Sequence, residues 1–322
     1  MKIKKFIAAV VVMCICMASM VGCGNNINEE AKGEYHIGVC QLTEHDALDE
    51  ATKGFCDALR AELGKDIVID IQVADETFEG CKVITDKFVA DGVDLIMANA
   101  TPALQAATES TGTIPVVATS ITDYSTALGI RKWSGITGIN ATGTSDLAPI
   151  SQQAEIIYEI VPNAEKIGIF YCVAESNSVY QAETMGKELE SRGAEYAFYS
   201  VKNADEIEAV ARQAAGENDV IYIPTDNTMA SRTDLLKQIF TENNVPVIAG
   251  EEGLCKAGVA TLSISYYNIG YNAGLMAADI LRNGTEPGLM EIKYADEYTK
   301  KYNPENADIL GLTIPNDYMR IE

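Results

Sequence analysis

Positive charge is scarce in this sequence. It holds 24 Lys and Arg against 47 Asp and Glu, a formal net charge of −23 at pH 7. Nucleic acids and anionic membrane surfaces attract clustered Lys and Arg, so this balance argues against nucleic acid as a partner and against electrostatic docking on lipid. Its 47% hydrophobic and 22% charged residues are instead typical of a folded globular protein.

Groups for catalysis are also few. Histidine occurs only at His36 and His45. No Ser, Cys or acidic residue stands in the spacing of a nucleophile elbow, a P-loop, a dinucleotide-binding loop or a zinc site. We therefore expect a protein that is not an enzyme and that has neither cofactor nor metal.

No apolar run has the roughly 20 residues that a bilayer-spanning helix needs. Three lysines within the first five residues precede an apolar stretch at residues 6–21, a pattern typical of an export signal. The stretch ends in Met20-Val-Gly-Cys23, which resembles a bacterial lipobox. This resemblance implies a signal peptide at 1–22, lipidation of Cys23 and a tether over 23–33. An ordinary signal peptide and an uncleaved anchor are the alternatives.

Cysteine pairing has little support. Of eight cysteines, Cys14 and Cys16 fall in the signal and Cys23 is the expected anchor. Five remain, an odd number with no C-x-x-C spacing. We predict that these five cysteines are buried, unpaired thiols. They are Cys40, Cys56, Cys81, Cys172 and Cys255.

The same order of alternating strands and helices is predicted twice along the chain. Three β-type segments at 37–41, 94–101 and 114–120 resemble three later segments that follow at offsets of 125 to 131 residues. Strands alternate with helical patterns in both halves, which predicts parallel sheets with right-handed crossovers. The predicted fold is α/β, with two similar doubly wound lobes joined by hinge crossings.

The lobes are predicted to be interleaved in sequence. A Gly-rich stretch at 135–146 is expected to be the first crossing, residues after a strand at 260–265 the second, and residues 309–314 the third. The predicted division is as follows: 34–143 plus 264–285 for the N-terminal lobe, and 144–263 plus 286–322 for the C-terminal lobe.

Polar residues follow the predicted strands in both halves. Ligands of open parallel sheets bind at the carboxyl ends of the strands, and helices that start there attract anions. Hydroxyls, amides and carboxylates together suit a zwitterion. Each residue can also be explained without a ligand, as a helix cap, a turn residue or a solvent-exposed acid. The set comprises Glu44, His45, Thr101, Thr119, Ser120, Asn177, Ser178, Asp226, Asn227, Glu251 and Glu252.

Six stretches, in this order along the chain, carry a resemblance to a known family: 41–49, 88–96, 100–103, Asn140-Ala-Thr-Gly-Thr-Ser-Asp146, Pro224-Thr-Asp-Asn-Thr228 and Ala249-Gly-Glu-Glu-Gly253. With them the chain resembles the ABC-transporter substrate-binding proteins of the tryptophan/tyrosine type, which have the type I periplasmic binding fold. Asp46 and Tyr124 stand where that family often has Pro.

This resemblance implies an extracytoplasmic lipoprotein that captures an aromatic amino acid between its lobes and delivers it to a membrane permease driven by an ATPase. It implies that Thr101, Thr119 and Ser120 hold the ligand carboxylate. Glu252, with Asp226 as the competitor, would hold the ammonium. Glu44, Asn177, Ser178 and Asn227 would complete the shell. Alternatives are a sugar, nucleoside or peptide-like ligand, a sensor without transport and, third, an enzyme.

Overall fold

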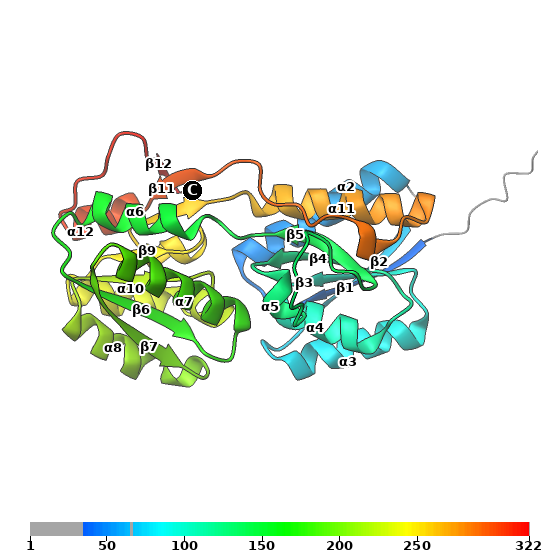
Figure 1. The fold of residues 1–322 in the computed structure, drawn as a ribbon, viewed down its shortest axis with the longest axis horizontal. Helices are drawn as coiled ribbons and strands as arrows, with labels where there is room; N and C mark the ends of the chain where they lie inside the picture. The colour runs from blue at the N-terminus through cyan, green and yellow to red at the C-terminus, as the bar shows by residue number, and fades with distance from the viewer. Residues whose placement is uncertain (1–34, 65–66, 322) are drawn as a thin grey trace, which may run out of the picture. The chain divides into compact units, whose positions relative to one another are not determined.

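Two sheets organise the residues that the computed structural model describes, 35–64 and 67–321. The first sheet has the order β2-β1-β3-β4-β5, with every neighbouring pair parallel (Figure 1). Its strands are β1 Tyr35–Gln41, β2 Ile67–Val73, β3 Leu95–Asn99, β4 Val116–Ile121 and β5 Ala141–Ser145. This architecture agrees with the predicted α/β class.

The second sheet has the order β12-β11-β10-β9-β8-β6-β7. Its pairs are parallel apart from β10 with β11 among the described strands. The strands are β6 Lys166–Cys172, β7 Glu195–Val201, β8 Val220–Ile223, β9 Val247–Ala249, β10 Ala260–Ser263, β11 Thr299–Tyr302 and β12 Met319–Arg320.

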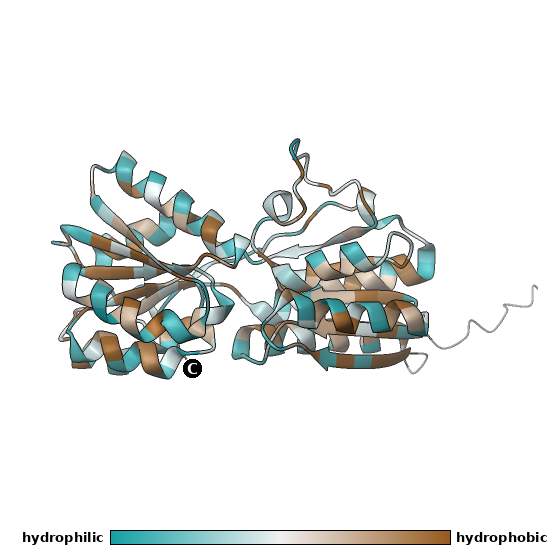
Figure 2. Ribbon diagram, turned by 90° about the horizontal axis from the view of Figure 1, so that it is seen from below, coloured by the Kyte–Doolittle hydropathy of each residue, from teal (hydrophilic) through white to brown (hydrophobic). Residues whose placement is uncertain are grey.

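Helices cover the faces of both sheets. Every residue of the central strands β3 and β4 is buried, whereas the edge strand β2 is only partly covered. Burial on both faces explains why the central strands are continuous apolar runs, and Figure 2 shows these runs among the helices. Helices of the first sheet are α2 Asp46–Leu63, α3 Phe78–Asp91, α4 Thr101–Ser110, α5 Tyr124–Ala127 and α11 Tyr266–Asn283; those of the second are α6 Ile150–Ile160, α7 Ser176–Ser191, α8 Ile207–Glu217, α9 Asn227–Ala230, α10 Thr233–Glu242 and α12 Pro304–Ile309.

Helix ends follow the sequence signals. Helix α3 ends at Gly92 and α11 at Gly284, both in the left-handed conformation that the missing side chain permits. The predicted single helix at 229–242 is wrong, because a turn from Met229 to Arg232 divides it into α9 and α10.

The chain passes three times between the sheets, at 146–149, 264–265 and 294–298. The predicted third crossing at 309–314 is wrong. Ile309 is the last residue of α12, and Leu310, Leu312 and Ile314 pack against the core beside the second sheet. The predicted first crossing at 135–146 is too long, because its residues 141–145 form β5 against β4.

Sheet membership also differs from the predicted division at two places. Strand β5 extends to Ser145, and the segment before the third crossing stays with β5, since Ser145 N donates to Lys293 O and Gly138 N donates to Gly288 O. Below, the first lobe means residues 35–145 and 266–293. The second lobe means residues 150–263 and 299–321.

Helices α2 and α11 lie side by side in the first lobe (Figure 1). Glycine permits this approach. A Cβ atom on Gly270 would overlap the carbonyl oxygen of Ala51, and one on Gly54 would overlap that of Tyr267. The close pair encloses a core that includes Phe55. Helix α11 therefore completes the first lobe although it follows most of the second in sequence.

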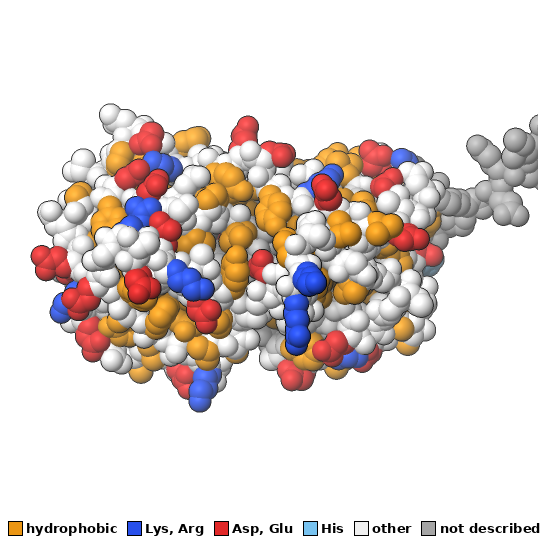
Figure 3. Space-filling view, viewed as in Figure 1, with side chains coloured by type: hydrophobic (Ala, Val, Ile, Leu, Met, Phe, Trp, Pro, Cys, Tyr) orange, Lys and Arg blue, Asp and Glu red, His pale blue; other side chains and the backbone are white. Residues whose placement is uncertain are grey.

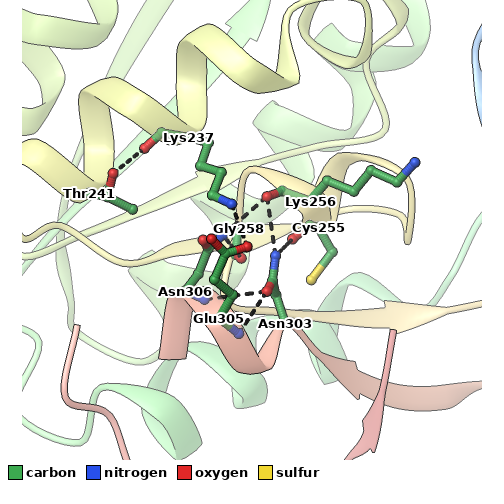
Figure 4. A network of polar contacts seen from close by, with 8 residues as sticks. All are labelled: Lys237, Thr241, Cys255, Lys256, Gly258, Asn303, Glu305 and Asn306. Atoms are coloured by element: carbon green, nitrogen blue, oxygen red, sulfur yellow. Dashed lines mark hydrogen bonds and ion pairs between the residues drawn. The ribbon is translucent and has the colours of Figure 1, made fainter. Parts of the chain in front are cut away.

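The segment around α12 fixes the loop at 255–258 (Figure 4). The Asn303 amide donates to the carbonyl oxygens of Cys255 and Lys256 at 3.3 and 3.2 Å. The Asn306 amide donates to those of Lys256 and Gly258 at 3.1 and 2.7 Å. The ammonium of Lys256 lies outside this network and pairs with Asp46 of the first lobe. The network therefore fixes the backbone of Lys256, whose ammonium forms an ion pair between the lobes.

The five cysteines of the described residues are buried and free, which confirms the predicted thiols. Lys and Arg side chains are scattered singly among acidic and apolar ones on the face in Figure 3. None of the described helices is long and apolar enough to cross a membrane. The predicted signal, tether and lipidated Cys23 lie outside the described residues.

Candidate functional site

A small cavity lies where strand ends of the two lobes meet. Its volume is about 10 Å³, about the room that one water molecule needs. The lobes touch beside it, since His45 Nε2 and Asn227 Oδ1 are 3.2 Å apart. A larger ligand therefore enters only when the lobes move apart. The lining residues are His45, Leu48, Ser120, Thr122, Asp146, Asn177, Thr225, Asp226, Asn227, Ala230, Glu251 and Tyr266.

The structure brings half of the predicted ligand residues to this cavity. His45 and Ser120 come from the first lobe, and Asn177, Asp226 and Asn227 come from the second. The other five do not line it: Glu44, Thr101, Thr119, Ser178 and Glu252.

Each of those five has a different environment. Glu44 is exposed. Thr101 is the buried first residue of α4, and the Thr119 hydroxyl accepts a hydrogen bond from Thr144 within the sheet. The Ser178 hydroxyl donates to Thr225 O at 3.4 Å.

Glu252 has a fixed counter-ion. Its carboxylate lies 2.6 and 2.8 Å from the Lys301 ammonium and also accepts from the Ser263 hydroxyl. It lines a larger cavity of about 770 Å³ beside the second and third crossings, which shares Glu251 and Tyr266 with the small one. The carboxylate predicted to hold the ligand ammonium is therefore neutralised within the protein.

Two buried polar atoms at the small cavity lack a hydrogen-bond partner, Ser120 Oγ and Asn177 Oδ1. Ser120 is 7% exposed and Asn177 6% exposed, so bulk solvent barely reaches them. Ser120 also has φ 58°, a left-handed conformation that is uncommon for serine. Because buried polar atoms are nearly always paired, these two indicate groups that await a ligand.

Asp226 is held by the backbone. Its carboxylate accepts from Cys172 N at 2.7 Å and from Met229 N at 2.9 Å, and burial followed by the charge of Glu175 raises its pKa well above the ordinary value. These bonds connect β6 to the start of α9. Asp226 therefore supports the cavity wall.

Glu175, which sequence analysis did not single out, organises the second-lobe wall. Its buried carboxylate accepts from the backbone and amide nitrogens of Asn227 at 3.0 and 2.6 Å. It also accepts from the backbone nitrogen and the hydroxyl of Thr228 at 2.8 and 2.7 Å. It also accepts from the Asn177 amide at 3.2 Å. One carboxylate thus orients both asparagines at the cavity. Its position before a helix was the available signal.

Two further carboxylates face the cavity. Asp146 accepts from the hydroxyls of Thr122 and Tyr266, each at 3.0 Å, and burial raises its pKa to about 6. Glu251 accepts from Gly253 N and Leu254 N, and burial raises its pKa to about 7. Sequence analysis gave Asp146 no role and treated Glu251 as one of many polar residues.

Positive charge is missing around these acids. None of the described residues lining the cavity is Lys or Arg. Burial lowers the pKa of His45 below its ordinary 6.5, so its imidazole is neutral at pH 7. The cavity therefore has an excess of negative charge.

Acidification should stabilise the ligand-free protein between pH 7.5 and 5.5. A carboxyl group with a raised pKa binds its proton more tightly in the folded than in the unfolded chain, so the free energy of unfolding rises as pH falls through that pKa. The values for Asp146 and Glu251 predict a gain of about 2 kcal/mol, and the lowered pKa of His45 offsets about 1 kcal/mol of it, because the unfolded chain binds that proton more readily. Urea unfolding at both pH values measures it, and an unchanged or lower midpoint at pH 5.5 would contradict it. Asp219, with a lowered pKa, titrates below this window.

Comparison with known families decides the identity. The profile of the ABC transporter substrate binding protein family matches residues 36–320. The chain belongs to this family. It is thus the substrate-binding protein of an ABC transporter, a class that works outside the cytoplasm.

Relatives of this substrate-binding protein support the same family assignment. A tyrosine-binding protein of Clostridioides difficile (strain R20291) is 34% identical over 97% of this chain and 93% of its own length. The solved structure of a Streptococcus pneumoniae ABC domain in complex with L-Trp is 29% identical in sequence. The match covers 88% of this chain and 97% of the other, with a TM-score of 0.83. These relatives are binding proteins, and their fold confirms the type I periplasmic binding architecture.

A ligand-free, open substrate-binding protein with adhesive properties from Clostridium difficile gives a lower TM-score of 0.69, although it is 32% identical over 89% of this chain and 99% of its own. The greater overlap with the L-Trp complex agrees with the contacts between the lobes beside the small cavity.

Proposed function

We propose that this substrate-binding protein captures an aromatic amino acid in the cavity between its lobes. The observation that carries the proposal is the pair of unpartnered buried atoms, Ser120 Oγ and Asn177 Oδ1, one on each lobe. A ligand that pairs with both stabilises the state in which the lobes touch, which is how such proteins close by hinge motion. The relatives with tyrosine and L-Trp support the ligand class.

His45 and Asn227 complete the proposed contacts. Their side chains contact each other across the lobes. They can therefore exchange this hydrogen bond for hydrogen bonds to the ligand. Thr101 and Thr119 remain proposed contacts for a carboxylate only if opening of the lobes exposes their hydroxyls. Glu44, Ser178 and Glu252 have weaker support, because they are exposed or already paired.

The cellular setting is also part of the proposal. The export signal and the lipobox-like Met20-Val-Gly-Cys23 support lipidation of Cys23, removal of residues 1–22 and a tether to the outer face of the membrane. The partners are then a permease and its ATPase. The protein binds its ligand without converting it.

Calorimetric titration of the soluble part, residues 34–322, with each of the twenty amino acids tests the ligand. We expect L-tyrosine or L-tryptophan to bind with a Kd of about 1 μM or lower, about −8 kcal/mol. Asn177→Ala should weaken this binding about tenfold or more, because it removes one of the two waiting acceptors. Asn283→Ala, at the exposed end of α11, is the control.

Two results would change the proposal. Failure of all twenty amino acids to bind at millimolar concentration would favour the sugar, nucleoside or peptide-like alternatives or a sensor. Release of a chemically altered ligand would favour an enzyme.

A further inference from the structure

We infer that Asp146, with Glu251, receives the cationic group of the ligand at the hinge, and that ligand capture expels a proton from this pair. The inference rests on the proposed function. It adds the residues that recognise the ammonium and a dependence of capture on pH.

Asp146 lies where two crossings meet. It is the first residue after β5, and its carboxylate accepts from Tyr266, the first residue of α11 after the second crossing. Its other oxygen accepts from Thr122, which follows β4. A group bound to Asp146 therefore contacts the junction about which the lobes move.

Among the described residues, no Lys or Arg forms an ion pair with either carboxylate of the pair. Glu251 is close enough for the charge of Asp146 to raise its pKa. Lys256 and Lys301 line the larger cavity with Glu251, but Lys256 pairs with Asp46. Tyr124 and Tyr266 are neutral because burial raises the pKa of each well above 10, and His45 is neutral as described. The Lys301 ammonium is held by Glu252.

The unpartnered atoms point to the same occupant. Asn177 Oδ1 is a carbonyl oxygen and only accepts hydrogen bonds, and Ser120 Oγ can accept one. Acceptors and carboxylates in one buried cavity match the three N–H donors of an ammonium. Asp226 also lines the cavity, and its bonds to the backbone of β6 and α9 hold it in the wall.

The proton balance follows from this arrangement. Without ligand, two buried carboxyl groups whose charges repel favour retention of a proton over double ionisation. An ammonium bound to both favours the doubly ionised pair, so the retained proton leaves to solvent as the N–H···O bonds form. Affinity therefore rises with pH until the ligand-free pair is fully ionised.

Calorimetry with L-tyrosine and L-tryptophan at pH 5.5, 6.5 and 7.5, in two buffers of different ionisation enthalpy, counts the released protons. We expect affinity to rise about 30-fold from pH 5.5 to 7.5, with release of up to one proton near pH 6.5. Indole-3-propionate, which lacks the ammonium, should bind more weakly and release none.

Asp146→Asn keeps a group that can bond to both hydroxyls and removes the charge. It should weaken binding at pH 7.5 about 30-fold and reduce proton release. Tyr266→Phe removes a bond that lowers the pKa of Asp146, so it should move the pH midpoint of binding upward with no change of charge. Glu297→Gln, an exposed carboxylate in the third crossing, is the charge-matched control.

The outcomes separate the two proposals. If no aromatic amino acid binds the wild type at any pH, the proposed function fails and this inference fails with it. If they bind with no pH dependence, or if Asp146→Asn binds and releases protons like the wild type, the inference alone is overturned.

Discussion

Replacement of Gly270 by alanine is expected to lower the free energy of unfolding by about 3 kcal/mol. Alanine is the better helix former by about 1 kcal/mol, so propensity alone predicts the opposite sign. The added methyl group would overlap the carbonyl oxygen of Ala51 in α2, and two packed helix backbones cannot easily separate without opening the core around Phe55. Chemical denaturation of the variant measures the loss.

Gly216→Ala is the matched control. Gly216 also lies within a helix, α8, but a Cβ atom there has no neighbour within 4 Å. That variant should gain up to about 1 kcal/mol from helix propensity. Equal effects of the two substitutions would show that α2 and α11 do not pack as closely as described.

Glu175→Ala is expected to reduce both stability and ligand affinity. It leaves two backbone N–H groups at the start of α9 without an acceptor, and it frees the amides of Asn177 and Asn227. Loss of charge-assisted bonds in a buried position predicts about 3 kcal/mol of destabilisation. Affinity for an aromatic amino acid should fall at least tenfold, because both asparagines face the cavity.

Denaturation and calorimetry together measure this variant. Glu190→Ala, an exposed acid on α7, has the same change of side chain and should leave both quantities within about 0.5 kcal/mol of the wild type. A Glu175→Ala protein with normal affinity would show that the asparagines keep their positions without this carboxylate.

Local patterns were sufficient for most of the fold. The continuous apolar run Leu95–Asn99 predicts a buried central strand, and Gly92 and Gly284 predict helix ends, because each depends on neighbours in sequence. Strand β5 was missed for a similar reason. Its sequence Ala141–Ser145 has two threonines and a glycine, and its hydroxyls are satisfied by groups far away, such as Ile269 O and Met290 O.

The candidate site was predictable only in outline. The polar ends of the strands predicted a site between the lobes, and His45, Ser120 and Asn177 from that prediction line the cavity. The roles of Glu251 and Glu252 could not be separated, because the difference is Lys301, which β11 brings to Glu252 from 49 positions away in sequence. The place of Asp146 at the cavity could not be predicted either, because it depends on the second crossing, which brings Tyr266 beside it.

The late position of α11 has a consequence for biogenesis. The ribosome completes all five strands of the first sheet by Ser145, yet the helix that closes over Phe55 begins only at Tyr266. The N-terminal half of the nascent polypeptide must therefore wait, with an apolar surface uncovered, until nearly the whole protein has been synthesised.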